Sequence, residues 1–201
     1  MGRVGLIGGT FDPIHNGHVL LAQFALEKIP LNRILFIPAA DPPHKDCVYV
    51  SASARMQMVS LAVADMESVF VSKIELDRSG KSFTVDTLRQ LCEQNPNDSY
   101  YLIIGDDNVS QISSWHDPEG IFELCTVVVG NRTITDRVGK KQFLDQMTLL
   151  DTPLFELSST EIRQRLITGR SVKGMIPESV ESYIREQGLY GTCRRKVLHT
   201  E

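Results

Sequence analysis

The sequence has little cysteine and only a small excess of negative charge. Its four cysteines stand far apart among 201 residues and form no C-x-x-C pair, which argues against a zinc site or a dithiol redox motif. A reduced, cytoplasmic setting is therefore expected. The 21 Lys and Arg residues against 25 Asp and Glu give a net charge of −4. Because the balance is slightly acidic and no long basic run occurs, we expect no nucleic-acid partner.

Long apolar runs are also absent. No stretch approaches the roughly 18 residues that a membrane-spanning helix needs, so no membrane partner is expected. The apolar run after Arg3 breaks at Gly8–Gly9, so we do not expect a signal peptide. Low-complexity segments, repeats and flexible linkers are missing as well. With 42% hydrophobic residues and low net charge, the chain is not expected to be disordered. Its length predicts one domain, followed by a flexible tail at 191–201.

Short apolar runs alternate with amphipathic segments along the chain. Strands are predicted at 3–7, 33–37, 69–76, 100–104, 125–129 and 154–157. Helices are predicted at 16–28, 53–65, 82–94, 160–168 and 178–187, with short helical segments near 108, 118 and 142–146. This alternation predicts an α/β fold with a mostly parallel sheet covered on both faces. Ligands bind such sheets beyond the carboxyl ends of the strands, so the turns after Ile7, Ile37, Ile104 and Val129 are where chemistry is expected.

The turn after the first strand reads GGTFDPIHNGH, residues 8–18. Gly8–Gly9 would let backbone N–H groups approach a ligand closely, and Thr10 adds a hydroxyl donor. His15 and His18 would share one side of the first helical turn, where anions are favoured. This pattern predicts phosphate binding. Two alternatives stay open: the glycines could simply make a strand-to-helix turn, and the histidines could be a metal pair, although no third ligand is near.

A second motif, SSTEIR, lies toward the C-terminus. Ser158 and Glu161 have the spacing of a capping box, which is a purely structural interpretation but does not exclude function. Ser158, Ser159 and Thr160 offer hydroxyl donors at the positive end of a helix. Arg163 follows about one turn later and could hold a second phosphate with its planar guanidinium. The motif is therefore typical of a phosphate clamp.

Together the two motifs resemble the nucleotidyltransferase superfamily that carries the H-x-G-H element, and more narrowly the bacterial nicotinate-nucleotide adenylyltransferases. The resemblance runs from Val4 to about Tyr190. It is supported by Pro42-Pro43-His44-Lys45, Arg55 with Met58, Ser82–Thr87, and Ile104–Asp107 with Trp115. It implies a Rossmann-like, doubly wound sheet in a single nucleotidyltransferase domain over 1–190, with a small C-terminal helical subdomain at about 158–190.

The resemblance also implies a reaction. The family transfers the AMP moiety of ATP to nicotinate mononucleotide, which yields nicotinate adenine dinucleotide and pyrophosphate in NAD biosynthesis. Both substrates are small molecules. Mg²⁺ would be held mainly by the ATP phosphates, so no protein metal site is expected, and a homodimer is compatible with the family.

The resemblance assigns roles to individual residues. ATP binding falls to Gly8, Gly9, Thr10, Phe11, His15, His18, Gly105, Asp107, Ser158, Ser159, Thr160 and Arg163. Catalysis falls to His18, His15, Arg163 and Lys45. Binding of the nicotinate nucleotide falls to Lys45, Thr84, Trp115 and Arg132. For Trp115 an ordinary core position, and for Thr84 an ordinary first helical turn, remain alternatives.

Two positions depart from the family pattern. His116 stands where an aromatic residue usually follows the tryptophan, and Asp106 where alanine often precedes the aspartate. Phosphopantetheine adenylyltransferases and small cytidylyltransferases share both phosphate motifs but lack the Ser82–Thr87 and Trp115 patterns. Class I aminoacyl-tRNA synthetases share an H-x-G-H element but would need an anticodon-binding region and a Lys-rich second loop. A non-catalytic nucleotide sensor is an alternative from another class of protein.

Overall fold

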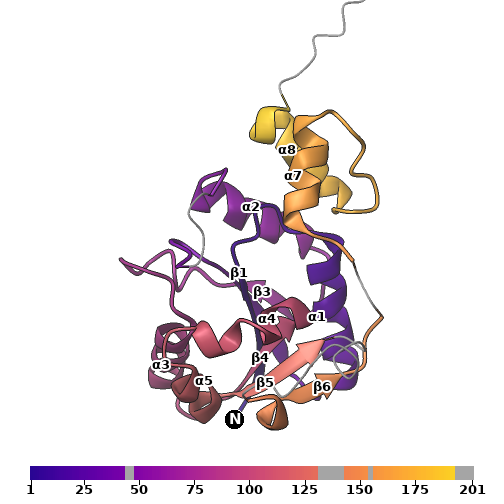
Figure 1. Cartoon of the computed structure of the whole chain (residues 1–201). Coiled ribbons are helices and arrows are strands. Elements are labelled where there is room, and N and C mark those ends of the chain that lie inside the picture. Colours follow the sequence, from indigo (N-terminus) through magenta and orange to yellow (C-terminus); the bar gives the residue numbers. More distant parts are fainter. Residues whose placement is uncertain (44–47, 131–142, 154–155, 193–201) are drawn as a thin grey trace, which may run out of the picture.

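A computed structural model describes residues 1–43, 48–130, 143–153 and 156–192 (Figure 1). These residues form a six-stranded sheet in the order β3-β2-β1-β4-β5-β6, and every pairing is parallel. The strands are β1 (Arg3–Gly9), β2 (Arg33–Pro38), β3 (Val69–Val71), β4 (Ser99–Gly105), β5 (Thr126–Gly130) and β6 (Thr148–Leu150). The predicted α/β class with a doubly wound sheet is therefore confirmed.

Helices follow the strands as the alternation predicted. They are α1 (Asn16–Lys28), α2 (Ala52–Ala62), α3 (Thr84–Gln94), α4 (Asp106–Val109), α5 (Pro118–Leu124), α7 (Ser159–Ile167) and α8 (Glu178–Glu186). Short 3₁₀ segments lie at Ile112–Ser114, Leu144–Gln146 and Leu189–Gly191. Most ends lie within a few residues of the prediction, because apolar periodicity and turn residues mark them.

Both faces of the sheet are buried. Successive residues of a strand point to opposite sides, so they pack in two different clusters. Ile7 and Ile103 pack in one cluster, together with residues of α1, α2, α7 and α8. Leu6 and Leu102 pack in the other, together with residues of α3 and α5. This placement of helices on both faces is visible in Figure 1.

Two strand predictions were wrong in part. The strand expected at 69–76 ends at Val71, and Ile74 is already in a turn. The last strand is Thr148–Leu150 and not 154–157, where residues 156 and 157 are irregular and 154–155 lie outside the described residues. Residues 148–150 form a strand because they pair with β5. Such a contact with another segment leaves no periodic signal in three residues.

The order of the strands defines a switch point. From β1 the chain winds outward through β2 and β3, and then returns to the other side of β1 with β4. The crevice at the carboxyl ends of β1 and β4 is where open α/β sheets bind ligands. The C-terminal helices α7 and α8 lie above this end of the sheet, on the side away from the N-terminus (Figure 1). No described helix is long and apolar enough to cross a membrane.

Candidate active site

The loop between β1 and α1 lies at the switch point. Gly8 is exposed, and an added Cβ there would meet nothing within 4 Å. At Gly9 a Cβ would approach the ring of Phe11 to 3.0 Å, so a side chain would crowd that ring. Phe11 itself is 2% exposed and packs against Phe36 and His18. Its side chain therefore packs inside the protein and shapes the loop from within.

His15, the N-cap of α1, and His18, in the first turn of α1, form one stacked pair. Their ring centroids are 3.7 Å apart with an angle of 25° between the planes. The backbone N–H of His15 donates to Nδ1 of His18 at 3.2 Å. This geometry assigns the proton of neutral His18 to Nε2, which makes Nε2 a hydrogen-bond donor.

His15 differs from His18 in its environment. It is 8% exposed, and burial lowers its pKa from 6.5 to about 4. It is therefore neutral at pH 7. Its Nδ1 is buried and has no hydrogen-bond partner within the described part of the chain. His15 thus supports the ring of His18, and it contributes no positive charge to the site.

The second motif folds against the first. Ser158 caps α7 by accepting from the backbone N–H of Glu161 at 3.2 Å, so the capping prediction is confirmed for that residue. Ser159 Oγ donates to the carbonyl of Pro13 at 2.9 Å. The hydroxyl of Thr160 accepts from Arg163 at 3.1 Å. The structure therefore brings together two motifs that lie about 150 residues apart in the sequence.

Arg163 is the cation at this junction. Its Nη1 donates to the carbonyl oxygen of Asp12 at 2.7 Å, and its guanidinium carbon lies 4.6 Å from the ring centroid of Tyr49. It is half-buried and lies beside the loop between β1 and α1, so it adds positive charge at this junction.

The carboxylate of Asp12 fixes the loop between β1 and α1 from inside the protein. Asp12 is 2% exposed. One of its oxygens accepts from the hydroxyl of Tyr190 at 2.6 Å, and the other accepts from the backbone N–H of Tyr49 at 2.8 Å. Burial and the neighbouring carboxylate raise the pKa of Tyr190, so its hydroxyl stays protonated and donates.

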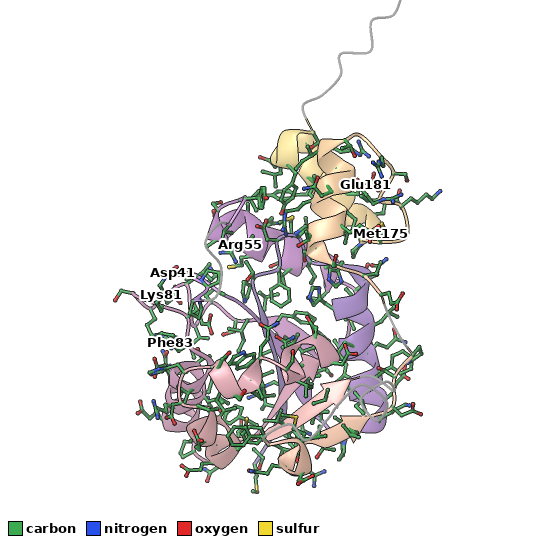
Figure 2. The ribbon with its side chains drawn as sticks, viewed as in Figure 1. Asp41, Arg55, Lys81, Phe83, Met175 and Glu181 are labelled. Carbon is green, nitrogen blue, oxygen red and sulfur yellow. The ribbon has the colours of Figure 1, made fainter. Side chains whose placement is uncertain are left out.

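Arg55 supports the same loop from α2. It is 1% exposed and donates to the carbonyls of Thr10 at 2.7 Å and Ala40 at 3.4 Å. Burial lowers its pKa, and the charge of Asp12 opposes that effect. The arginine joins the carboxyl ends of β1 and β2, and Figure 2 shows it on α2 between the sheet and the C-terminal helices.

The carboxyl end of β4 is followed by Asp107, the residue predicted to bind the ribose. Gly105 caps α4, and a Cβ at this position would lie 2.6 Å from Oδ1 of Asp107. A side chain at position 105 would therefore make the carboxylate of Asp107 move from its present position. Asp107 is exposed and accepts from the side-chain amide of Asn108 at 2.9 Å.

The segment before α3 is packed against the end of β2. Ser82 Oγ accepts from the backbone N–H groups of Ala40 at 3.0 Å and Asp41 at 3.2 Å, and Lys81 pairs with Asp41 at 2.9 Å (Figure 2). Phe83, the N-cap of α3, provides no side-chain cap. Thr84 therefore begins α3 with backbone N–H groups that can face an anion.

The loop that carries Trp115 is joined to α3. The ring centroids of Phe83 and His116 lie 4.4 Å apart. Arg89 of α3 forms an ion pair with Asp117, whose carboxylate also caps α5. Trp115 is half-buried and packs on the core cluster of this face. The structure thus brings the Trp115 loop to the N-terminal turn of α3.

A buried carboxylate stabilises that turn from the other side. Glu75 is 7% exposed and accepts from the hydroxyl of Thr87 at 2.7 Å. Burial raises its pKa, while hydrogen bonds from Thr87 and Ser82 oppose that rise. Arg78 also donates to Thr87, at 3.1 Å.

Some predictions cannot be placed in the structure. Lys45 and Arg132 lie outside the described residues. Over the described ranges, no group of three or more His, Cys, Asp and Glu side chains could hold a metal ion. The donors gathered here are N–H groups, hydroxyls and guanidinium groups, which suit phosphate oxygens.

Sequence reasoning missed the contacts around Asp12. Its place in the first motif was clear, but the motif alone does not say that the carboxylate is buried. Tyr49 and Tyr190 are single aromatic residues outside any periodic pattern. Arg55 was noticed only as part of the resemblance, since one arginine on a predicted helix gives no sign of burial.

Comparison with known proteins places the chain in a family. The cytidylyltransferase-like family matches residues 6–165. A protein of Exiguobacterium sibiricum named "Probable nicotinate-nucleotide adenylyltransferase" is 39% identical over 193 residues, which cover 94% of this chain and 100% of that protein. A protein of the same name from Citrifermentans bemidjiense is 40% identical, covering 96% of this chain and 100% of its own. The chain belongs to the nicotinate-nucleotide adenylyltransferase family.

Solved structures agree on the fold of this adenylyltransferase family. The nicotinic acid mononucleotide adenylyltransferase of Plasmodium falciparum, solved in complex with NaAD, superimposes with a TM-score of 0.80 at 20% identity. The match covers 96% of this chain and 99% of that one. The predicted Rossmann-like architecture is therefore confirmed.

Proposed function

We propose that this protein transfers the adenylyl group of ATP to nicotinate mononucleotide, giving nicotinate adenine dinucleotide and pyrophosphate in NAD biosynthesis. Family membership supports the reaction. The observation that carries it within this structure is the junction of the two phosphate motifs, where Arg163 and Ser159 bind the backbone of Asp12 and Pro13 at the switch point.

The chemistry explains the composition of the site. The attacking group is the phosphate of nicotinate mononucleotide, which is already anionic at pH 7. One of its oxygens forms a bond to the α-phosphorus of ATP while the bond from that phosphorus to the leaving pyrophosphate breaks. No protein nucleophile or general base is needed, so positioning and charge stabilisation supply the catalysis.

We assign the phosphates to the two motifs. Thr10 and Nε2–H of His18 would contact oxygens near the α-phosphorus, with the N-terminus of α1 adding its dipole. Ser159, Thr160 and Arg163 would hold the β- and γ-phosphates, and Arg163 would stabilise the leaving pyrophosphate. We place Lys45 on the phosphates as well, and Gly8–Gly9, Phe11 and Ser158 around them through backbone groups or packing. Asp107 would accept from the ribose hydroxyls beside Gly105.

The acceptor would lie between α3 and the loop at 115–117. Trp115 would offer a flat surface to the nicotinate ring, and the N–H groups of the first turn of α3 at Thr84 would meet its carboxylate. Free N–H donors suit a carboxylate better than an amide, which also needs an acceptor. This arrangement favours nicotinate over nicotinamide, and Arg132 would add charge nearby.

Magnesium fits this site as part of the nucleotide. The described residues provide phosphate donors, so the ion would enter coordinated mainly by triphosphate oxygens. Bound there, Mg²⁺ would supply positive charge that offsets the charge of the phosphates. We also propose that residues 1–190 form one domain with the helical part at 158–190, that the protein works in the cytoplasm, and that it forms a homodimer, which sedimentation equilibrium would test.

The function is tested by pyrophosphate release from ATP and Mg²⁺ with three acceptors. These are nicotinate mononucleotide, nicotinamide mononucleotide and phosphopantetheine, compared by kcat/KM. We expect a strong preference for the nicotinate form. Equal use of both pyridine nucleotides would keep the reaction but contradict the carboxylate assignment. Binding of ATP with no release would instead indicate a non-catalytic nucleotide sensor.

A further inference from the structure

Tyr49 is an exposed aromatic residue that nothing above assigns to the reaction. It lies between β2 and α2, and 52% of its surface is accessible. A single exposed aromatic residue is common on protein surfaces and by itself does not indicate a function. Here, however, the ring lies against the guanidinium of Arg163, whose central carbon is 4.6 Å from the ring centroid.

The backbone of Tyr49 is fixed although its ring is exposed. Its N–H donates to the buried carboxylate of Asp12 at 2.8 Å. That carboxylate is itself fixed by the hydroxyl of Tyr190 at 2.6 Å. The ring therefore projects from a backbone segment that is anchored to the loop between β1 and α1.

The contacts of Arg163 show what the ring adds. Nη1 donates to the carbonyl of Asp12 at 2.7 Å, and Nη2 donates to the hydroxyl of Thr160 at 3.1 Å. These two bonds fix the ends of the guanidinium, and its central carbon lies over the ring of Tyr49. An arginine held by two hydrogen bonds and one aromatic face has little freedom left.

We propose that Tyr49 is a positioning residue for adenylyl transfer, and that its ring holds the guanidinium of Arg163 in the orientation that meets the polyphosphate of ATP. The inference rests on the proposed function. Charge on the leaving pyrophosphate grows as the bond to the α-phosphorus breaks. A cation that is oriented in advance stabilises this charge without rearranging during the reaction.

The test compares Tyr49→Phe, Tyr49→Leu and Tyr49→Ala. Phenylalanine keeps the aromatic face and should retain kcat/KM for ATP within about twofold. Leucine and alanine should lower it by about 3- to 10-fold, as expected for a cation–π contact together with lost orientation. KM for nicotinate mononucleotide should change by less than about twofold. Phe70→Ala is the matched control, because Phe70 is 54% exposed on β3 and should leave the kinetics unchanged.

A double-mutant cycle separates positioning from a general structural effect. Affinity for pyrophosphate is measured by calorimetry for the wild type, Tyr49→Ala, Arg163→Ala and the double variant. If the ring acts through Arg163, the Tyr49→Ala change should have no effect once the arginine is gone. An equal loss in both backgrounds would overturn the inference, and so would a Phe variant as impaired as the Ala variant.

The same cycle keeps this inference distinct from the proposed function. If the wild type releases no pyrophosphate with any acceptor, the proposed reaction fails, while coupling between Tyr49 and Arg163 in pyrophosphate binding can still be measured. If the wild type is active and the cycle is additive, the reaction stands and the role of Tyr49 is wrong. Thermal unfolding of each variant shows whether the fold is kept.

Discussion

The hydroxyl of Tyr190 donates to the buried carboxylate of Asp12 at 2.6 Å, which joins the end of the helical C-terminal part to the loop between β1 and α1. The same loop accepts Ser159 and Arg163 from α7 through backbone carbonyls. A further bond runs from the side chain of Asn16 to the carbonyl of Gly174 at 2.8 Å. The C-terminal part therefore completes the site as well as covering it.

Tyr190→Phe should lower the free energy of unfolding by about 1–3 kcal/mol, because the buried carboxylate of Asp12 loses a hydrogen bond. Urea unfolding at pH 7 measures this loss. Tyr183→Phe is the control, since Tyr183 is a half-buried tyrosine of α8 outside this contact. Equal stability of the Tyr190 variant and the wild type would show that the bond contributes nothing.

His15 should make stability depend on pH. Its folded pKa of about 4 lies below the 6.5 of the unfolded chain, so the unfolded state binds more protons between these values. Stability should fall by up to about 3 kcal/mol as pH drops toward 4, and the effect disappears about one pH unit above 6.5. Urea titrations of the wild type and His15→Gln isolate this part, because the variant cannot titrate there. Parallel pH profiles of the two proteins would contradict it.

His18→Ala should reduce kcat by about 100- to 1000-fold, the usual loss when one donor to a transition-state charge is removed. Pyrophosphate release measures turnover, and circular dichroism checks that the fold is intact. Turnover near that of the wild type would refute the role of Nε2–H. Because His18 lies in the first turn of α1, His18→Gln, which keeps a side-chain donor, is the informative companion.

Trp115→Ala should raise the KM of nicotinate mononucleotide by about tenfold or more while that of ATP changes little, since stacking on an aromatic face provides about 1–3 kcal/mol. Trp115→Phe should recover most of the loss. Steady-state kinetics with each substrate varied in turn give both constants. An equal rise in both would mean that the residue supports the core and not the acceptor.

Gly105→Ala should displace the carboxylate of Asp107, because the new Cβ would lie 2.6 Å from its Oδ1. The backbone itself, at φ −76°, accepts alanine without strain. We expect a several-fold rise in the KM of ATP that Asp107→Asn reproduces, with little change for the acceptor. An unchanged KM in both variants would move the ribose contact away from Asp107.

Much of the site could be predicted because it is local. The first motif lies between β1 and α1, and all three fall within residues 3–28. Periodicity and turn chemistry therefore identify them. The second motif is equally local, and Ser158 caps α7 as its spacing predicted. The strand at Thr148–Leu150 could not be predicted, because only its pairing with β5 makes it a strand.

The sequence by itself determined the α/β alternation, the two phosphate motifs and the family resemblance, since these depend on residues near one another along the chain. The tertiary structure alone decided that His15 is buried and neutral while His18 keeps a donor, and that Arg163 lies on the ring of Tyr49. It also decided that Asp12 is shared by Tyr49 and Tyr190. Burial and contact between distant segments arise only when the sheet and the C-terminal helices pack, because the hydrophobic effect fixes how much surface is covered and not which side chains meet.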